Sequence, residues 1–362
     1  MRPKVLMNAE SFGFGPTAAI ASFFPYLRPH VPTLGYIGEG HSLDLQTPLP
    51  YNDLHDCTNW SDSAILRVMR QYDVFVTATD FRMAALAKQA GLFTVIYDPL
   101  TWFWREMPDA VKACDMYLAQ NFIGVADALA GYLPHMRAQA HTVAPILQKA
   151  VPLHKGDTVL INFGGLLNPF WSLADAVSYA RSMYRAIKAT LPVDVTPVVC
   201  ASTAIAKALP EMNAKSYARA DMLTLMAQSK LAFMTSGLGN IYDAAQYDLP
   251  TVWLPPTNDS QGQQLALLVN AGLTDQHIDW QHIDGSLAVD YHAPQAEVMA
   301  HIVRRVHGLA APAARTAVAH AYAQVNALGH SKTRGLIQRF GTGGAEEVAG
   351  HILNILESKA AA

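Results

Sequence analysis

The stretch TSGLGNIYDAAQYDLPTVWLP (residues 235–255) decides the fold, because it reads as a turn, a helix, a helix stop and a strand. Gly237 and Gly239 lie in the turn, the helical pattern carries Asp243, and an apolar strand follows at residues 251–254. A glycine-bearing turn before a helix presents unpaired backbone N–H groups at the positive end of the helix dipole, which suits a phosphate or diphosphate. A carboxylate further along the helix can accept both hydroxyls of a ribose. The stretch therefore predicts a nucleotide held by its diphosphate and its sugar.

Length and composition predict a compact protein of two domains. The chain has 362 residues, which is beyond the size at which one core usually stops growing, and 51% of them are apolar. A net charge of −3 without a Lys/Arg run argues against a nucleic-acid partner. Cys57, Cys114 and Cys200 lie far apart, which predicts neither a disulfide framework nor a CxxC metal site.

The N-terminal residues, MRPKVLMNAE, contain too short an apolar run for a signal peptide, and no apolar segment of 18 residues follows. We therefore expect a soluble, cytoplasmic protein without an integral membrane segment. The sequence leaves the oligomeric state open, and a homodimer is among the states it allows.

Short apolar runs alternate with helical patterns along the chain. In the first half, strands are expected at residues 4–7, 33–37, 74–77, 93–97, 116–119 and 142–146, and helices at 17–26, 61–71, 81–90 and 125–132. In the second half, strands are expected at 158–162, 195–200, 231–234 and 251–254, helices at 171–188, 220–227, 242–246 and 263–270, and a mostly helical tail at 294–359. Strands spaced by helices in this way indicate an α/β protein with parallel sheets covered on both faces.

The segment PILQKAVPLHKG (residues 145–156) is the best candidate for a linker, because it has two prolines, mixed charge and no period. We predict two doubly wound, Rossmann-like domains at residues 1–148 and 157–340, and a C-terminal helix at 341–362 that packs back toward the first domain. We expect a cleft between the domains, with ligands outside the carboxyl ends of the strands.

Two glycine loops of the second domain are candidates for the same pocket. The functional interpretation places nucleotide phosphates on Ser236 to Asn240, and the alternative is an ordinary turn in which one of these two residues caps the helix. Asn162 begins the run NFGG, in which Gly164 and Gly165 let the backbone approach a ligand. The alternative for this run is a tight turn that needs a positive φ. Two such loops on one sheet edge favour a pocket.

A polar loop, PPTNDSQGQQ (residues 255–264), follows one strand and precedes a helix. Its amides and carboxylate can bind sugar hydroxyls, and Gln263 and Gln264 stand at its end. The alternative is a solvated loop, for which this composition is typical.

The first domain offers the loop NAESFGFGPT (residues 8–17), which follows the first strand. Its glycines permit close approach to an acceptor at Phe12, Gly13 and Phe14, and Glu10 can act as a general base. The spacing is not GxGxxG, so a dinucleotide fingerprint is not predicted. The alternative is a turn with Pro16 near the helix start.

Further candidates stand near strand ends of the first domain. Asp80 and Asp98 each follow an apolar strand, and either can cap a helix instead of serving the site, which for Asp80 is the expected role. Trp102 opens the aromatic run WFW, which can stack on a flat acceptor or belong to a core or interface. His41 lies in a polar loop, where a histidine either faces the cleft or is simply solvated.

Taken together, these stretches resemble the GT-B glycosyltransferases, most closely the branch of the bacterial enzyme that adds N-acetylglucosamine to lipid I. That branch has a small-Gly turn, a Glu-bearing helix ending in Gly-Leu-Pro, a strand, and a loop ending in Gln. Here the turn is SGLGN (residues 236–240), Asp243 stands in place of the ribose-binding Glu, and DLP (248–250) matches Gly-Leu-Pro. Gln263 and Gln264 fall where the branch binds donor sugar hydroxyls. NFGG (162–165) is similar to its glycine loop, and VAPI (143–146) to the end of its first domain.

The first domain departs from that branch, since Phe14 stands where the lipid I enzyme has a His. The pattern SFGFGP (residues 11–16) is more similar to the cytosylglucuronate synthases, which join a sugar from a UDP-sugar to cytosine. Asp243 is one carbon shorter than the Glu it replaces.

The resemblance implies an inverting, metal-independent transfer of a sugar from a nucleotide donor, a UDP-sugar, to a small-molecule acceptor such as a nucleobase. No cofactor is implied beyond the donor. Glu10 is the first choice for the general base, followed by His41 and Asp80. Two alternatives remain, a nucleotide-sugar 2-epimerase with the same architecture and a non-catalytic protein that binds nucleotide sugars.

Overall fold

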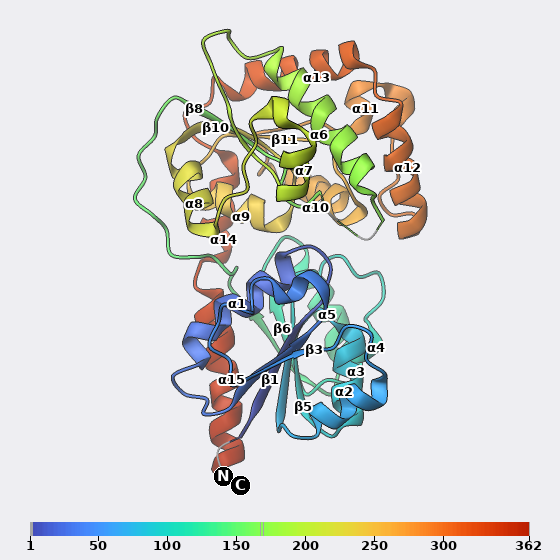
Figure 1. Ribbon diagram of the computed structural model, residues 1–362, viewed down its shortest axis with the longest axis vertical. Helices are drawn as coiled ribbons and strands as arrows, with labels where there is room; N and C mark the ends of the chain where they lie inside the picture. The colour runs from blue at the N-terminus through green and yellow to red at the C-terminus, as the bar shows by residue number, and fades with distance from the viewer. Residues whose placement is uncertain (1–2, 167, 169, 362) are drawn as a thin grey trace. The chain divides into compact units, whose positions relative to one another are not determined.

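A computed structural model gives the fold of residues 3–166, 168 and 170–361. The chain divides into two compact units, Met1–Gln148 with Phe340–Ala362, and Lys149–Arg339 (Figure 1). Each unit is an α/β layer structure around its own parallel sheet. The prediction of an α/β protein with two parallel sheets is confirmed.

The sheet of the first unit has seven strands in the order β3-β2-β1-β4-β5-β6-β7, and all neighbouring strands pair in parallel. The strands are β1 (Val5–Ala9), β2 (Leu34–Gly38), β3 (Asp53–Asp56), β4 (Val74–Ala78), β5 (Phe93–Asp98), β6 (Met116–Gln120) and β7 (Gln139–Val143). Every residue of β1, β2, β4 and β6 is buried, as expected for strands covered on both faces.

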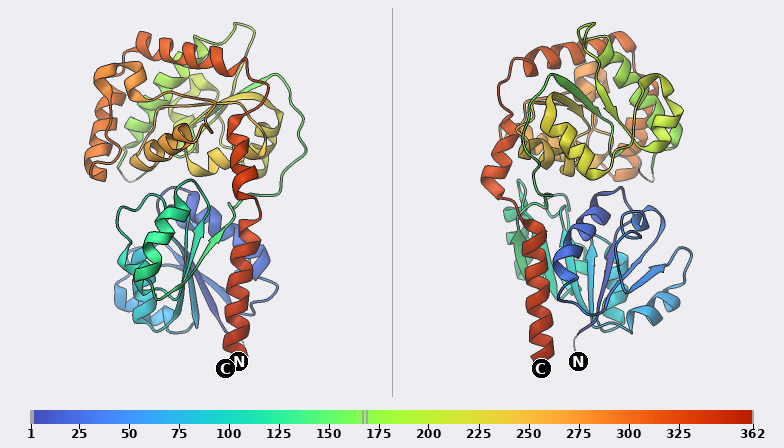
Figure 2. Two further views of the ribbon diagram at one scale, coloured as in Figure 1. Left: turned by 180° about the vertical axis from the view of Figure 1, so that it is seen from behind. Right: turned by 60° about the vertical axis from the view of Figure 1, so that its left-hand side comes forward.

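Successive residues of β1 alternate between the two faces of this sheet. Val5 and Met7 pack with α1 and α15, whereas Leu6 packs with α2 and α3. The long helix α15 lies along α1 and β7 (Figure 2). The helices are α1 (Gly15–Leu27), the 3₁₀ helix η1 (Gly40–Leu43), α2 (Asp62–Met69), α3 (Phe81–Gln89), α4 (Asp109–Ala113), α5 (Val125–Tyr132), η2 (Leu133–His135) and α15 (Gly344–Ala361).

The sheet of the second unit has five parallel strands in the order β12-β11-β10-β8-β9. They are β8 (Thr158–Asn162), β9 (Val198–Cys200), β10 (Ser229–Met234), β11 (Thr251–Trp253) and β12 (Gln276–His277). The register pairs Met234 of β10 with Asn162 of β8, so the chain leaves these two central strands side by side at their carboxyl ends.

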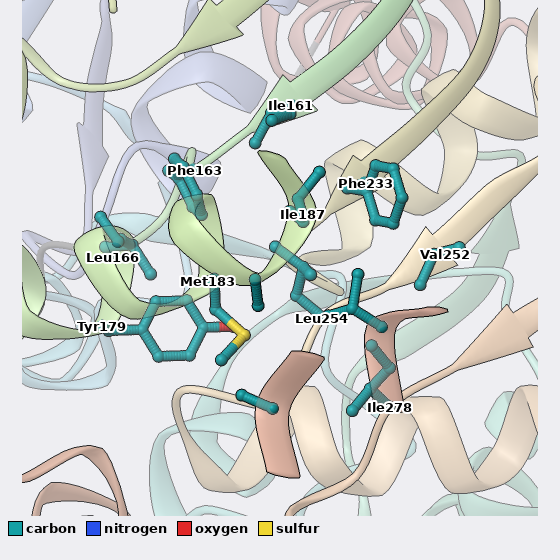
Figure 3. Close-up of a cluster of buried hydrophobic side chains, with 14 of the residues drawn as sticks. Ile161, Phe163, Leu166, Tyr179, Met183, Ile187, Phe233, Val252, Leu254 and Ile278 are labelled. Atoms are coloured by element: carbon teal, nitrogen blue, oxygen red, sulfur yellow. The ribbon is translucent and has the colours of Figure 1, made fainter. Parts of the chain in front are cut away.

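Helices of the second unit bury apolar side chains against this sheet. One core joins Ile161 and Phe233 of the sheet to Tyr179, Met183 and Ile187 of α6 (Figure 3). The helices are α6 (Leu173–Lys188), α7 (Thr203–Ala208), η3 (Pro210–Met212), α8 (Arg219–Gln228), α9 (Leu238–Gln246), α10 (Asp259–Asn270), α11 (Trp280–Ile283), η4 (Gly285–Leu287), α12 (Gln295–His307), α13 (Ala311–Val325), η5 (Lys332–Arg334) and α14 (Gly335–Phe340).

The observed elements differ from the sequence-based expectations in several places, and three of these differences have a clear physical reason. β3 was not predicted, because its sequence DLHD is polar and mostly exposed at the sheet edge. β7 begins and ends three residues earlier than expected. Its sequence QAHTV is mostly polar, so the apolar run that would indicate the start of a strand is missing. α10 begins at Asp259 inside the segment predicted as a loop, because Asn258 caps it by accepting a hydrogen bond from the Gln261 amide.

In the part of the chain that the structure describes, none of the helices is both long enough and apolar enough to cross a membrane.

Candidate functional site

The two glycine loops of the second unit lie together at the carboxyl edge of its sheet. The Thr235 amide donates to the Asn162 carbonyl at 3.3 Å, and the Thr235 hydroxyl donates to the Gly164 carbonyl. Because β8 and β10 are adjacent and parallel, both loops open on the same edge. This is the arrangement on which the predicted pocket depends.

Side-chain amides hold the two loops to each other. The Asn162 Oδ1 atom accepts from the Gly164 amide at 2.8 Å, and its Nδ2 atom donates to Asn240 Oδ1 at 3.2 Å. Asn240 Nδ2 in turn donates to the Thr235 carbonyl at 3.0 Å. In this geometry both ends of the Asn240 amide are engaged within the protein, so Asn240 offers a ligand its backbone N–H more readily than its side chain.

Helix α9 begins at this edge with unused main-chain donors. Its N-cap is Gly237, at φ −68° and ψ 144°, and no side chain of the described residues caps it. The alternative in which Ser236 or Asn240 caps the helix is therefore wrong. The first N–H groups of a helix lack intrahelical partners, and the helix dipole makes them attractive to an anion.

The glycines of the two loops differ in why a side chain is absent. Gly165 has φ +79°, and a Cβ at Gly164 would lie 3.0 Å from Asn162 Oδ1, so the protein's own backbone and packing require these two glycines. The expected alternative, a turn with a positive φ, is thus present at Gly165. Gly237 and Gly239 lack a positive φ, and a Cβ at either would meet nothing within 4 Å. The space in front of α9 is therefore open.

The residues predicted to bind sugar hydroxyls contact other parts of the second unit. Gln264 is buried and donates to the Ser236 carbonyl, while Gln263 donates to the Tyr291 carbonyl at 2.7 Å. Both lie in helix α10 rather than in a loop. The Ser236 hydroxyl donates to the Gln261 carbonyl at 3.4 Å. Through these contacts α10 supports the turn at residues 235–237. The sugar-binding role of Gln263 and Gln264 stays a prediction.

Asp243 lies in α9 and is paired with Arg219, which is not among the residues predicted from the sequence. Its Oδ2 and Oδ1 atoms each accept a hydrogen bond at 2.6 Å from Arg219, through Nη1 and Nη2 respectively. Only 1% of the Asp243 side chain is exposed, against 42% of Arg219. Burial raises the pKa of Asp243, and the guanidinium opposes that rise. A ribose hydroxyl cannot reach this carboxylate unless the pair rearranges. No pattern in the sequence links two residues 24 positions apart.

In the first unit, acidic groups gather at the carboxyl edge of the sheet. Glu10 directly follows β1, Glu39 follows β2 and Asp80 follows β4, three adjacent strands. Burial, together with the charges of Asp80 and Glu39, raises the pKa of Glu10 to about 7. Asp80 accepts from the Met83 amide at 2.9 Å and caps α3, as expected for this residue.

The loop after β1 is braced by His41. The His41 Nε2 atom lies 2.7 Å from the Gly13 carbonyl, and its ring meets Phe14 edge to face at 5.3 Å. Gly13 has φ +62°, and Pro16 stands at the start of α1, so the predicted turn is present. Phe14 is 47% exposed and Phe12 is half-buried. His41 therefore shapes the loop and leaves aromatic surface open.

Asp98 is fully buried at the end of β5. It accepts hydrogen bonds from Tyr117 at 2.8 Å, from Trp104 Nε1 at 2.7 Å and from the Leu100 amide at 2.6 Å. Burial raises the pKa of this carboxyl. With no exposed surface, Asp98 does not fit the direct acceptor contact predicted for it, and it instead orders the loop of aromatic residues that follows.

That loop belongs to a larger group of ring contacts. Trp102 packs against Phe103 at 5.8 Å and against Phe122 at 5.5 Å, and Trp104 meets Phe81 edge to face at 5.3 Å. Trp102 is half-buried and donates to the Pro99 carbonyl at 3.1 Å. These rings follow β4, β5 and β6, so part of an aromatic surface lies at the same edge as Glu10. In the described residues no His, Cys, Asp and Glu side chains cluster so as to hold a metal ion.

No protein-family model and no curated protein matches the chain. Solved structures do match. The crystal structure of Acinetobacter baumannii MurG has 12% sequence identity and a TM-score of 0.54, over 98% of this chain and 100% of that one. The glycosyltransferase of kitacinnamycin has 14% identity and a TM-score of 0.56, with 98% and 100% coverage. LpCGTa in complex with UDP has 13% identity and a TM-score of 0.56, with 98% and 99% coverage. Together with the two parallel sheets, these likenesses show that the chain has the GT-B glycosyltransferase fold.

Proposed function

We propose that this protein is an inverting glycosyltransferase that moves a sugar from a nucleotide donor, a UDP-sugar, to a small-molecule acceptor. The second unit would bind the donor and the first unit the acceptor. The observation that carries the proposal is the start of α9, where an uncapped helix N-terminus and two glycines leave open space at the carboxyl edge of β10. UDP is the nucleotide named in several of the matching structures, including LpCGTa and TcCGT1. We propose further that the protein belongs to the branch of the lipid I enzyme, which the sequence pattern of residues 235–264 supports.

The start of α9 suits a diphosphate for two reasons. Its free N–H groups can donate to phosphate oxygens, and its dipole stabilises the negative charge that grows on the leaving group. The glycines allow those oxygens to approach the backbone closely, since no Cβ stands in the way. The Asn162–Asn240 contact holds this turn in place before any ligand arrives.

Glu10 is the proposed general base. In the transfer, an acceptor hydroxyl or N–H attacks the anomeric carbon, the bond from that carbon to the diphosphate oxygen breaks, and the proton passes to the Glu10 carboxylate. A base whose pKa is near 7 is well suited to this task at neutral pH. The exposed rings at Phe14 and the half-buried Trp102 would give a flat acceptor a surface on which to stack.

Gly239→Asp tests the donor site. An Asp in the first turn favours the helix dipole and therefore the fold, but its carboxylate occupies the space of the diphosphate. We expect UDP to raise the melting temperature of the wild type in a thermal-shift screen of UDP, GDP, CDP and dTDP. The variant should lose at least about 100-fold in affinity for UDP, because a like charge replaces open space.

Ala311→Asp is the matched control, since it places the same charge in the exposed first turn of α13 in the same unit. It should bind UDP as the wild type does. If no nucleotide stabilises the wild type, or if Gly239→Asp binds UDP normally, the donor site is wrong. Release of free UDP from a UDP-sugar without any acceptor would instead favour the epimerase, and stable binding without turnover on any acceptor would favour a non-catalytic binding protein.

A further inference from the structure

The contact between Arg219 and Asp243 joins two neighbouring helices of the second unit. Arg219 is the first residue of α8, Asp243 lies on α9, and the two helices pack side by side (Figure 1). The two hydrogen bonds at 2.6 Å form a bidentate pair of guanidinium and carboxylate. The carboxylate is buried and the arginine side chain is 42% exposed, so the arginine is the partner that a ligand can reach.

The Arg219 guanidinium has N–H donors that the pair with Asp243 does not use. A guanidinium carries five N–H groups, and the two bonds to Asp243 use two of them. The pair also fixes the direction of a side chain that would otherwise lose much rotamer freedom on binding a ligand. Because the Asp243 charge balances that of Arg219, the remaining donors suit neutral hydroxyl oxygens better than a second phosphate.

The position along α9 indicates which part of a nucleotide lies nearby. Asp243 is five residues beyond Leu238, the first residue of the helix, which corresponds to about 7.5 Å along the helix axis. A diphosphate bound at the start of α9 would therefore place its ribose within reach of this part of the helix. The predicted ribose ligand Asp243 is buried there, and the exposed group beside it is the Arg219 guanidinium.

We infer that Arg219 donates hydrogen bonds to the ribose hydroxyl oxygens of the donor nucleotide, and that Asp243 is a positioning residue that aims it. This inference rests on the proposed function, because it takes the diphosphate to lie at the start of α9. The site then distinguishes ribose from 2′-deoxyribose through a guanidinium, in place of the direct carboxylate contact that the sequence predicts.

The test compares the binding of UDP and 2′-deoxyuridine diphosphate by titration calorimetry. The wild type should bind UDP roughly tenfold more tightly, the effect of one lost hydrogen bond to a charged group. Arg219→Gln should bring this ratio close to one while UDP still binds through its diphosphate. Since that variant leaves a buried carboxylate without its partner, the double variant Arg219→Gln/Asp243→Asn, with a neutral amide pair, gives the same readout in a more stable protein.

A matched control is the ion pair of Arg181 and Glu211 in the same unit, whose side chains are 40% and 47% exposed. Arg181→Gln/Glu211→Gln should keep the wild-type ratio. The inference is overturned if the Arg219 variants keep the ratio, if only Asp243→Asn loses it, or if the wild type does not discriminate. In those cases binding of UDP by the wild type still leaves the proposed function standing. A wild type that binds no nucleotide overturns both.

Discussion

The two sheets end in loops of contrasting chemistry. At β8 and β10 the loops are rich in small residues, their side-chain amides are engaged with one another, and they offer a ligand mainly backbone N–H groups. At β1, β4 and β5 the loops offer side chains, namely carboxylates and aromatic rings. The first arrangement suits a diphosphate, a group common to many donors. The second suits recognition of one acceptor and movement of its proton.

This contrast bears on which substitutions matter. A site made of main-chain groups is harmed by added bulk or charge, and little by trimming side chains. A site made of side chains is harmed by removing them. The predictions that follow test the side-chain edge of the first unit, in order of decreasing effect.

Glu10→Gln should have the largest effect. Loss of a general base lowers the rate by about 10²–10⁴-fold, and UDP affinity should not change because the donor is proposed to bind the other unit. In the wild type kcat/KM should rise with pH up to about 7, where Glu10 becomes ionised, and then level off. The variant should lack this ascending limb. Equal pH profiles for the two proteins would remove Glu10 from the mechanism and leave His41 to be tested by the same profile.

The same group makes a prediction about stability. A pKa raised in the folded state means that folding favours the protonated carboxyl, so stability is greater below the unfolded pKa and is lost as the pH rises through about 7. At pH 8 Glu10→Gln should therefore melt at a higher temperature than the wild type, and at pH 5 the two should differ less. Scanning calorimetry at both pH values measures this. A variant less stable than the wild type at pH 8 would mean that the ionised Glu10 side chain stabilises the folded protein, contrary to this prediction.

The fold followed from the sequence because its signal is local. Apolar runs such as residues 74–77 and 158–162 predict the central strands, since a strand buried on both faces is largely apolar. Polar edge strands such as β3 lack that signal. The start of α10 could have been predicted from the sequence. Gln261 follows Asn258 by three residues, and this spacing is typical of a helix start.

The side-chain contacts of the candidate site could not be read in the same way. The glycines of residues 235–240 predict a main-chain site, because backbone geometry constrains the residue types nearby. The pairing of Arg219 with Asp243, and the contacts of Asp98 with Tyr117 and Trp104, depend on how separate elements pack. A carboxylate at a strand end looks the same in sequence whether it faces a ligand or is buried on protein donors.

Asp98→Ala should destabilise the first unit without touching a ligand directly. Removing the carboxylate leaves the buried Tyr117 hydroxyl and the Trp104 N–H without their acceptor, which should lower the free energy of unfolding by about 3 kcal/mol. Urea denaturation followed by tryptophan fluorescence measures the loss. Asp109→Ala is the control, because that side chain is 96% exposed and its ion pair with Lys112 should contribute less than about 0.5 kcal/mol. A loss as small as that of the control would mean that the hydrogen bonds of Asp98 contribute little to the stability of this loop.

Trp102→Ala should have the smallest effect and the most specific one. If this half-buried ring stacks on the acceptor, the variant should raise the KM for an aromatic acceptor by about fivefold, the equivalent of about 1 kcal/mol of ring contact, and leave the KM for the UDP-sugar unchanged. Tyr26→Ala removes an exposed ring from the last turns of α1 and should change neither constant. Because Trp102 also packs on Phe103 and Phe122, a general loosening of the loop would lower kcat for aliphatic and aromatic acceptors alike. Only a change confined to the KM of aromatic acceptors would support the view that the sheet edge of the first unit binds its ligand through side chains, whereas the edge of the second unit binds through the backbone.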